Sequence, residues 1–212
     1  MANVQFTPGM RGSDIVIAQI KKRWKKAVVL FWIMTAIILG MGVAGFLVEN
    51  YVLVVIAMFF LLPILIPTII FTVKYTHPMK CRPLKHRPVI LKEADWLMEN
   101  IRFRNDVLIV SDSFFAPPSD LSAIIATQEV LLMYKQTITT NFLTSYFIAV
   151  ETVRGKTSIP YLRNQEQMVV DTIGAVMQFC PHARLGYNQE NINYVEYMRS
   201  MWEEPQKNQM QR

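Results

Sequence analysis

Charged side chains are almost missing from one long stretch of this 212-residue sequence. Between Ala27 and Val73 only Glu49 is charged. Apolar residues make up 52% of the chain and charged residues 18%, and both departures from an average soluble composition come mainly from this stretch. A purely soluble single-domain protein and a disordered chain are therefore excluded.

Cysteine is scarce too, since Cys81 and Cys180 are the only two. That number excludes a disulfide-dense secreted scaffold. The sequence also lacks G-x-S-x-G, H-E-x-x-H, a P-loop, the dinucleotide-binding fingerprint and C-x-x-C. The Ser-Asp-Ser run at 111–113 is first of all a turn signature, and His77, Cys81 and His86 lack a fourth ligand for zinc. We therefore expect no catalytic residue, no metal site and no cofactor, and we do not expect an enzyme.

Two uncharged runs, residues 27–48 and 51–73, are each long enough to cross a bilayer. As helices they rise roughly 33 Å, close to the hydrocarbon thickness. Only Glu49 and Asn50 separate them, so the two spans must form an antiparallel helical hairpin. A soluble pair of apolar helices and a cleaved signal peptide are less favoured alternatives.

Positive charge flanks the predicted hairpin on both sides. Residues 1–26 contain six Lys or Arg and one acid, Asp14, and residues 74–92 contain six Lys or Arg and no acid. The positive-inside rule then places both termini in the cytoplasm and Glu49 outside. The expected location is the plasma membrane, most simply that of a bacterium, with two spans.

Ten of these basic residues lie next to the predicted inner leaflet. Each can add about 1 kcal/mol of attraction to anionic lipid. They act either as topology determinants alone or as a site for anionic lipid head groups or an acidic partner, and the sequence leaves both open. Nucleic acid is not an expected partner, because no aromatic-interleaved fold accompanies the charge. The ten residues are Lys21, Lys22, Arg23, Lys25, Lys26, Lys74, Lys80, Arg82, Lys85 and Arg87.

Small residues recur every four positions in the first span, at Ala36, Gly40 and Ala44. Such a stripe lets two helix backbones approach closely. Its partner is either the second span of the same chain or a second copy in a homo-oligomer. In the second span, Pro63 and Pro67 predict a helix kink. Neither span contains Asp, Glu, Lys, Arg or His, which argues against a self-contained transporter.

The segments beside the spans have different patterns. Residues 1–26 form a basic N-terminal amphipathic segment, with Ser13 as the expected N-cap of a helix that enters the membrane. Residues 74–92 contain three prolines after a basic residue or histidine, which predicts an extended, semi-stiff linker.

Residues 93–212 carry ten positive and fourteen negative charges, so the basic excess belongs to the membrane flanks. A short helix is expected over 93–100, a hairpin over 106–116, and strands over 129–137 and 143–153. Residues 164–180 predict an amphipathic helix with Asn164 as N-cap and Gln167 in a capping box.

A second amphipathic helix is expected over residues 188–204, followed by a polar, disordered tail over 205–212. Its aromatic and methionine face is a possible docking surface for an unknown protein partner. The docking residues predicted on this face are Tyr194, Tyr197, Met198, Met201 and Trp202.

Strands followed by a packed helix are the order of a pleckstrin-homology-like (PH-like) barrel. The segments DVLIVSDSFFAP, EVLLMYKQT, FIAVETVRGKTSIP and NQEQMVVDTIGAVMQFC carry this likeness. The chain resembles largely uncharacterised bacterial two-span membrane proteins with a small PH-like cytoplasmic domain. The resemblance implies a membrane α-helical hairpin plus an α+β domain at 93–187, with a PH-like antiparallel sheet or partial barrel and C-terminal helices.

The sequence and this resemblance together predict a membrane-anchored, cytoplasm-facing interaction or scaffold module that binds a partner protein or anionic lipid. The alternative is an accessory subunit of a membrane transport or secretion complex.

Overall fold

The computed structural model describes residues 10–141 and 143–210. The chain divides after Lys92 into two compact units, which we call the helical unit and the α+β unit. The helical unit contains four helices: α1 (Gly12–Leu47), α2 (Tyr51–Thr76), the 3-10 helix η1 (Pro78–Lys80) and α3 (Arg82–His86). Helix α4 (Ile90–Glu99) begins at the division and continues into the α+β unit.

Helices α1 and α2 are long and apolar enough to cross a membrane. At 1.5 Å per residue they measure roughly 54 Å and 39 Å. Helix α1 contains both the predicted N-terminal helix and the first predicted span in one continuous element. The predicted N-cap is wrong, because α1 begins one residue before Ser13 and Arg11 occupies the N-cap without a side-chain bond.

Residues 48–50 form the turn that joins the two long helices. Glu49 has a positive φ of 54°, and the Asn50 side chain accepts a hydrogen bond from the Leu53 N–H at 3.4 Å. The turn brings Gly45 against α2, where an added Cβ would lie 2.8 Å from the Cβ of Leu53. Only glycine fits this close approach, so Gly45 sets the geometry of the hairpin turn.

Hydroxyl groups meet between the two helices of the hairpin. The Oγ1 atoms of Thr35 and Thr68 are buried and 3.1 Å apart. Nearer the open end of the hairpin, the Trp32 Nε1–H donates to Thr72 Oγ1 at 3.1 Å. Such hydrogen bonds help to hold apolar helices together where the hydrophobic effect does not act between them.

The predicted extended linker over 74–92 is wrong, because most of this segment is helical. Pro78 is the first residue of η1, and Pro83 lies in the first turn of α3. A proline at the start of a helix loses no intrahelical hydrogen bond, and its fixed φ suits the first turn. The prolines therefore begin short helices here. Pro63 and Pro67 lie inside α2, which continues through both.

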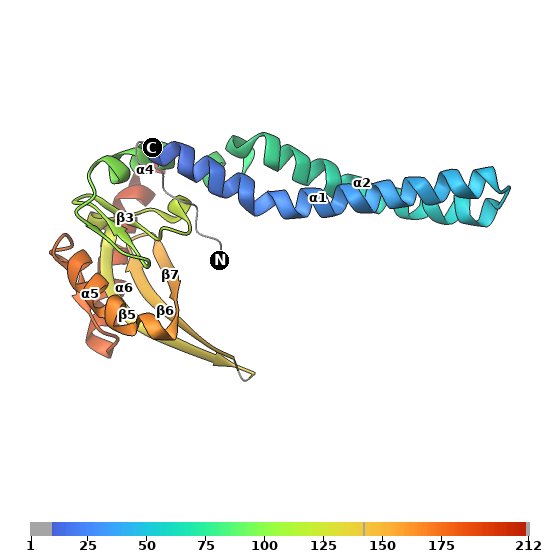
Figure 1. The fold of residues 1–212 in the computed structure, drawn as a ribbon. Coiled ribbons are helices and arrows are strands. Elements are labelled where there is room, and N and C mark those ends of the chain that lie inside the picture. The colour runs from blue at the N-terminus through green and yellow to red at the C-terminus, as the bar shows by residue number, and fades with distance from the viewer. Residues whose placement is uncertain (1–9, 142, 211–212) are drawn as a thin grey trace. The chain divides into compact units, whose positions relative to one another are not determined.

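The α+β unit contains two four-stranded sheets (Figure 1). The first has the order β1-β2-β3-β4 and is antiparallel throughout. The second has the order β7-β6-β5-β8, and only β8 runs parallel to its neighbour. The strands are β1 (Phe103–Arg104), β2 (Ile109–Val110), β3 (Phe114–Ala116), β4 (Ile125–Ala126), β5 (Val130–Thr140), β6 (Leu143–Thr152), β7 (Gly155–Tyr161) and β8 (Arg184–Leu185).

The second sheet is covered on both faces. Alternate residues of β5 point to opposite sides, so Met133 joins the core formed with the first sheet and helix α5 (Glu166–Met177). Leu132 and Tyr134 instead join a smaller core with Val195 of helix α6 (Gln189–Met210). Short 3-10 helices η2 (Leu121–Ala123), η3 (Thr127–Glu129) and η4 (Arg163–Gln165) connect the strands and α5.

The strands predicted over 129–137 and 143–153, and the hairpin over 106–116, are confirmed with small changes in bounds. The capping box before α5 is wrong. Asn164 lies inside η4, and the Gln165 side chain accepts from the Leu162 N–H at 2.9 Å instead. The tail predicted from Pro205 is helical up to Met210 in the structure, where α6 continues through Pro205.

Candidate functional site

A basic cavity of about 300 Å³ lies within the helical unit. Its cationic lining comes from four helices: Arg23 of α1, Lys74 of α2, Lys80 of η1, and Arg82 and Lys85 of α3. No acidic side chain lines it among the residues that the structure describes. Five of the ten basic residues singled out in the sequence therefore surround one cavity.

The fold of residues 77–86 explains why cations far apart in the sequence gather here. Chain reversal after α2 begins at His77, whose N–H donates to Val73 O at 2.8 Å. The Cys81 thiol, buried at the junction of η1 and α3, donates to Lys74 O at 3.6 Å. Leu84 is also fully buried. These apolar anchors hold the two short helices in place, so their basic residues line the cavity.

Trp24 gives the cavity an aromatic wall. Its ring stacks on Phe71 with centroids 5.4 Å apart, and the Lys74 Nζ lies 4.6 Å from the centre of the Trp24 ring. This cation–π contact orients the ammonium of Lys74 at the wall of the cavity. Ile20, Cys81, Pro83 and His86 complete the lining.

Clustered Lys and Arg side chains around a cavity suit phosphate chemistry. Guanidinium groups bind phosphate oxygens in a bidentate way, and ammonium groups act as compact point charges. The attraction of each cation also offsets part of the cost of removing a bound anion from water. The arrangement is thus able to hold an anionic head group, with Trp24 beside the more apolar part of the ligand.

No family model, curated protein or solved structure matches this chain. The site therefore has to be interpreted from its own residues.

The other five predicted cations, at positions 21, 22, 25, 26 and 87, do not line the cavity. Sequence reasoning identified the basic residues but not which of them converge. The spacing of the prolines is the sequence feature from which this convergence could have been predicted. Pro78 and Pro83 each lie in the first turn of a short helix, and these helices turn the basic segment back toward α1 and α2.

The small-residue stripe does not form the contact within the hairpin. Ala36, Gly40 and Ala44 are all exposed on α1, and an added Cβ at Gly40 would meet nothing within 4 Å. The hairpin packs instead through Gly45 and Gly42, where a Cβ at Gly42 would lie 3.4 Å from Ala57. The homo-oligomer interpretation of the stripe stays a prediction.

The five predicted docking residues of α6 fall into two groups, one packed against the core and one exposed. Tyr194 and Met198 pack against the core beneath α6, so they are structural. Tyr197, Met201 and Trp202 are exposed large side chains. Only these three remain available to a partner.

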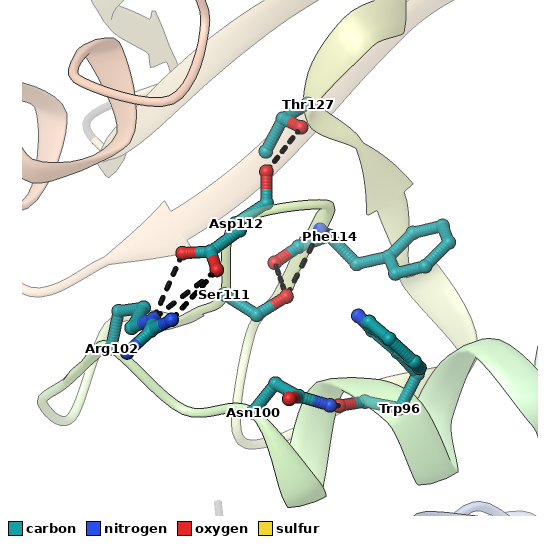
Figure 2. Close-up of polar contacts among 7 residues, drawn as sticks. All are labelled: Trp96, Asn100, Arg102, Ser111, Asp112, Phe114 and Thr127. Atoms are coloured by element: carbon teal, nitrogen blue, oxygen red, sulfur yellow. Dashed lines mark hydrogen bonds and ion pairs between the residues drawn. The ribbon is translucent and has the colours of Figure 1, made fainter.

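The Ser-Asp-Ser segment is a hydrogen-bonded turn (Figure 2). The fully buried Ser111 hydroxyl accepts from the Phe114 N–H and donates to Phe114 O. Arg102 holds Asp112 through Nε and Nη2 at 2.9–3.2 Å, and Thr127 donates to the Asp112 carbonyl at 3.0 Å. Hydrogen bonding to Arg102 lowers the pKa of Asp112. The side chains are thus committed to holding the turn.

Cys180 is buried in the main core of the α+β unit. Burial raises the pKa of its thiol to about 12, so it stays protonated and unreactive near neutral pH. In the described part of the chain, no three His, Cys, Asp or Glu residues are grouped so that they could hold a metal ion.

Proposed function

We propose that this protein is a membrane-anchored, cytoplasm-facing binding module whose basic cavity holds the phosphate head group of an anionic lipid. In this proposal α1 and α2 cross the bilayer as a hairpin, and both termini lie in the cytoplasm. The α+β unit, proposed to be PH-like, is thereby held at the inner surface of the membrane.

The observation that carries the proposal is the convergence of Arg23, Lys74, Lys80, Arg82 and Lys85 on one cavity. Topology determination needs positive charge near the inner surface but does not need it gathered around a cavity. The cavity also lies at the polar end of α2, just beyond its apolar run. A lipid head group would meet this level when the acyl chains lie beside the hairpin.

The test compares two triple variants of the full chain in a mild uncharged detergent. One replaces Lys80, Arg82 and Lys85 with Gln. The matched control replaces Lys21, Lys25 and Lys26 with Gln, which removes the same charge from residues outside the cavity lining. Native mass spectrometry then counts bound phosphatidylglycerol, with zwitterionic phosphatidylcholine as the reference lipid.

The cavity triple variant should lose most of the bound phosphatidylglycerol. At about 1 kcal/mol for each cation, three cations correspond to roughly a 100-fold weaker affinity. The control variant should retain nearly all of it. Equal losses in the two variants would show that the basic residues act only as diffuse surface charge, and the proposal would then be wrong.

A second candidate function, an accessory subunit of a membrane transport or secretion complex, has one supporting observation. The stripe at Ala36, Gly40 and Ala44 is exposed along α1, and stripes of this kind favour close packing with another helix. Replacing Gly40 with Ile should then disrupt a cross-linked complex without unfolding the hairpin.

A further inference from the structure

Strands β5 and β6 form an arm that extends past the rest of the α+β unit (Figure 1). Their pairing continues to Thr140 and Leu143, next to the turn. Side chains from Thr137 to Thr140 are exposed, and Leu143 is 76% exposed. The sequence holds no charged residue between Lys135 and Glu151, so the arm is an uncharged, exposed ribbon.

One edge of this arm lacks a neighbouring strand. Strand β8 pairs with β5 only at Leu132 and Met133. The Gly186 N–H then donates to Met133 O at 3.0 Å, and Gly186 leaves the sheet with a φ of 89°. Within the described ranges, no strand pairs with this side of β5 from Tyr134 to Thr140.

The direction of the backbone groups follows from the bond to Gly186. The Met133 carbonyl points toward the β8 side of β5. Because the backbone groups of successive strand residues alternate between the two edges, the N–H and C=O groups of Lys135, Thr137 and Thr139 also point toward this side. Thr139 lies directly opposite Thr144 of β6, and their Oγ1 atoms are 3.3 Å apart, which fits a non-hydrogen-bonded pair. The free edge therefore presents three N–H and three C=O groups, the template that another strand binds.

This edge is complementary to itself. It contains seven residues, limited by β8 at one end and by the Asn141 turn at the other. Two copies laid antiparallel with Thr137 opposite Thr137 match along the whole length, and Lys135 of one copy faces Thr139 of the other. No two lysines oppose each other. A register shift in one direction would drive both turns against β8, and a shift in the other direction would leave groups of each free edge unpaired. Such a contact is isologous and closes with two copies.

A second cavity, of about 540 Å³, lies at the base of the same edge. Both Tyr134 and Lys135 line it, and consecutive strand residues point to opposite faces, so the cavity must open at the strand edge. Its other walls are mainly apolar, with Val170, Ile173 and Met177 of α5 among them. An antiparallel second arm would bring its turn, with the exposed Leu143 beside it, to this position.

We infer that two copies of this protein associate through their arms, by antiparallel pairing of the free β5 edges about Thr137. The second arm completes the sheet beyond β8, and the exposed Leu143 beside its turn covers the cavity next to Tyr134. This association does not depend on the basic cavity or on lipid binding.

Disulfide trapping tests the register in the full chain in mild detergent. In a directly opposed hydrogen-bonded pair the Cα atoms lie about 5.5 Å apart, within the range for a disulfide. Thr137→Cys should therefore give a covalent dimer under mild oxidation. The native Cys81 and Cys180 are buried and give little background. Thr144→Cys, exposed on β6 of the same arm, is the control and should stay monomeric.

A second measurement follows the association itself by light scattering over a range of protein concentrations. Thr137→Pro removes the outward N–H of each copy without touching the bonds to β6, and Thr137→Val keeps it. At about 1 kcal/mol for each lost bond, the proline variant should dimerise roughly 30-fold more weakly. The valine variant should resemble the native chain.

Three results would overturn the inference. One is a native chain that stays monomeric at every concentration. Another is equal cross-linking of Thr144→Cys and Thr137→Cys. The third is a dimer that resists Thr137→Pro but is lost in Gly40→Ile, which would place the contact on α1.

Discussion

Arg199 fastens α6 to the second sheet, and its removal should loosen this helix. Its Nε–H donates to Thr152 O at 2.9 Å, and its Nη2 donates to Glu151 Oε2 at 2.9 Å. The Glu151 side chain is only 13% exposed and that of Arg199 29%. Arg199→Met keeps most of the aliphatic stem but deletes both bonds.

The magnitude follows from what each group loses. A hydrogen bond to a charged group contributes about 1.5–3 kcal/mol, and two are lost. Glu151 keeps Lys156 at 3.8 Å and the Tyr134 hydroxyl at 3.4 Å, so its charge is not left isolated. Two such bonds amount to about 3–6 kcal/mol. Because Arg199 is partly exposed and Glu151 keeps other partners, we expect the free energy of unfolding to fall by less, about 2–4 kcal/mol. For a domain of this size the melting temperature should fall by roughly 6–15 °C.

Two measurements on the full chain in uncharged detergent check this. Thermal unfolding gives the shift in melting temperature, and hydrogen exchange reports the protection of α6 amides near Val195. The control is Arg102→Met. Arg102 makes an equally short ion pair with Asp112, but its side chain is 61% exposed, and exposed pairs contribute about 0–1 kcal/mol.

Hydrogen exchange separates this explanation from a general loss of stability. Arg199→Met should speed exchange in α6 more than in α5, because α5 packs on the other face of the sheet. A melting temperature lowered no more by Arg199→Met than by Arg102→Met would refute the reasoning. So would unchanged protection of α6.

Two further predictions concern other parts of the chain. Gly45→Val should prevent the tight hairpin turn, because its Cβ would lie 2.8 Å from the Cβ of Leu53. In detergent, the melting temperature of its helical unit should lie well below that of the control Gly40→Val, whose Cβ meets nothing within 4 Å. Burial raises the pKa of the Cys180 thiol from 9.0 to about 12, so between these pH values the thiol ionises in the unfolded chain but keeps its proton in the folded one. The free energy of unfolding should therefore fall as the pH rises above about 9, by at most 1.4 kcal/mol per pH unit from this group. In thermal melts at alkaline pH, the stability of Cys180→Ala should fall less steeply with pH than that of the native chain, and an equal slope would contradict the prediction.

The long helices were predictable because one physical signal dominates them. More than twenty successive residues without charge allow few structures, whatever the rest of the chain does. Which face of α1 meets α2 was not predictable in the same way. The stripe at Ala36, Gly40 and Ala44 and the contact residue Gly45 are equally small, and the turn geometry at Glu49 selects between them.

In the α+β unit, the long strands β5 and β6 follow from alternation and β-branched residues. The two-residue strands β1, β2, β4 and β8 are too short to carry a periodic signal, so pairing with neighbours defines them. Alternation of apolar and polar residues does not predict that β5 continues past the core from Thr137 onward. The exposure of these side chains depends on which elements pack on each face of the sheet, and alternation does not show that.

The basic cavity was predictable only in composition. The cations at 74, 80, 82 and 85 are evident in the sequence, but their convergence depends on Pro78 and Pro83 beginning helices. Both an extended segment and a helix start are compatible with a proline. The side chains of Cys81 and Leu84 favour the helix start, because they are buried in the folded chain, and this burial is not evident from the sequence.

The sheet that lies between α5 and α6 imposes an order on biosynthesis. Residues of α6 cover Leu132, Tyr134 and Ala149, and α6 leaves the ribosome after the strands that it covers. Until α6 has formed, one apolar face of the sheet lacks its cover. This face of the sheet therefore stays uncovered until α6 has been made, and a chain cut short before Gln189 would expose it to chaperones and proteases.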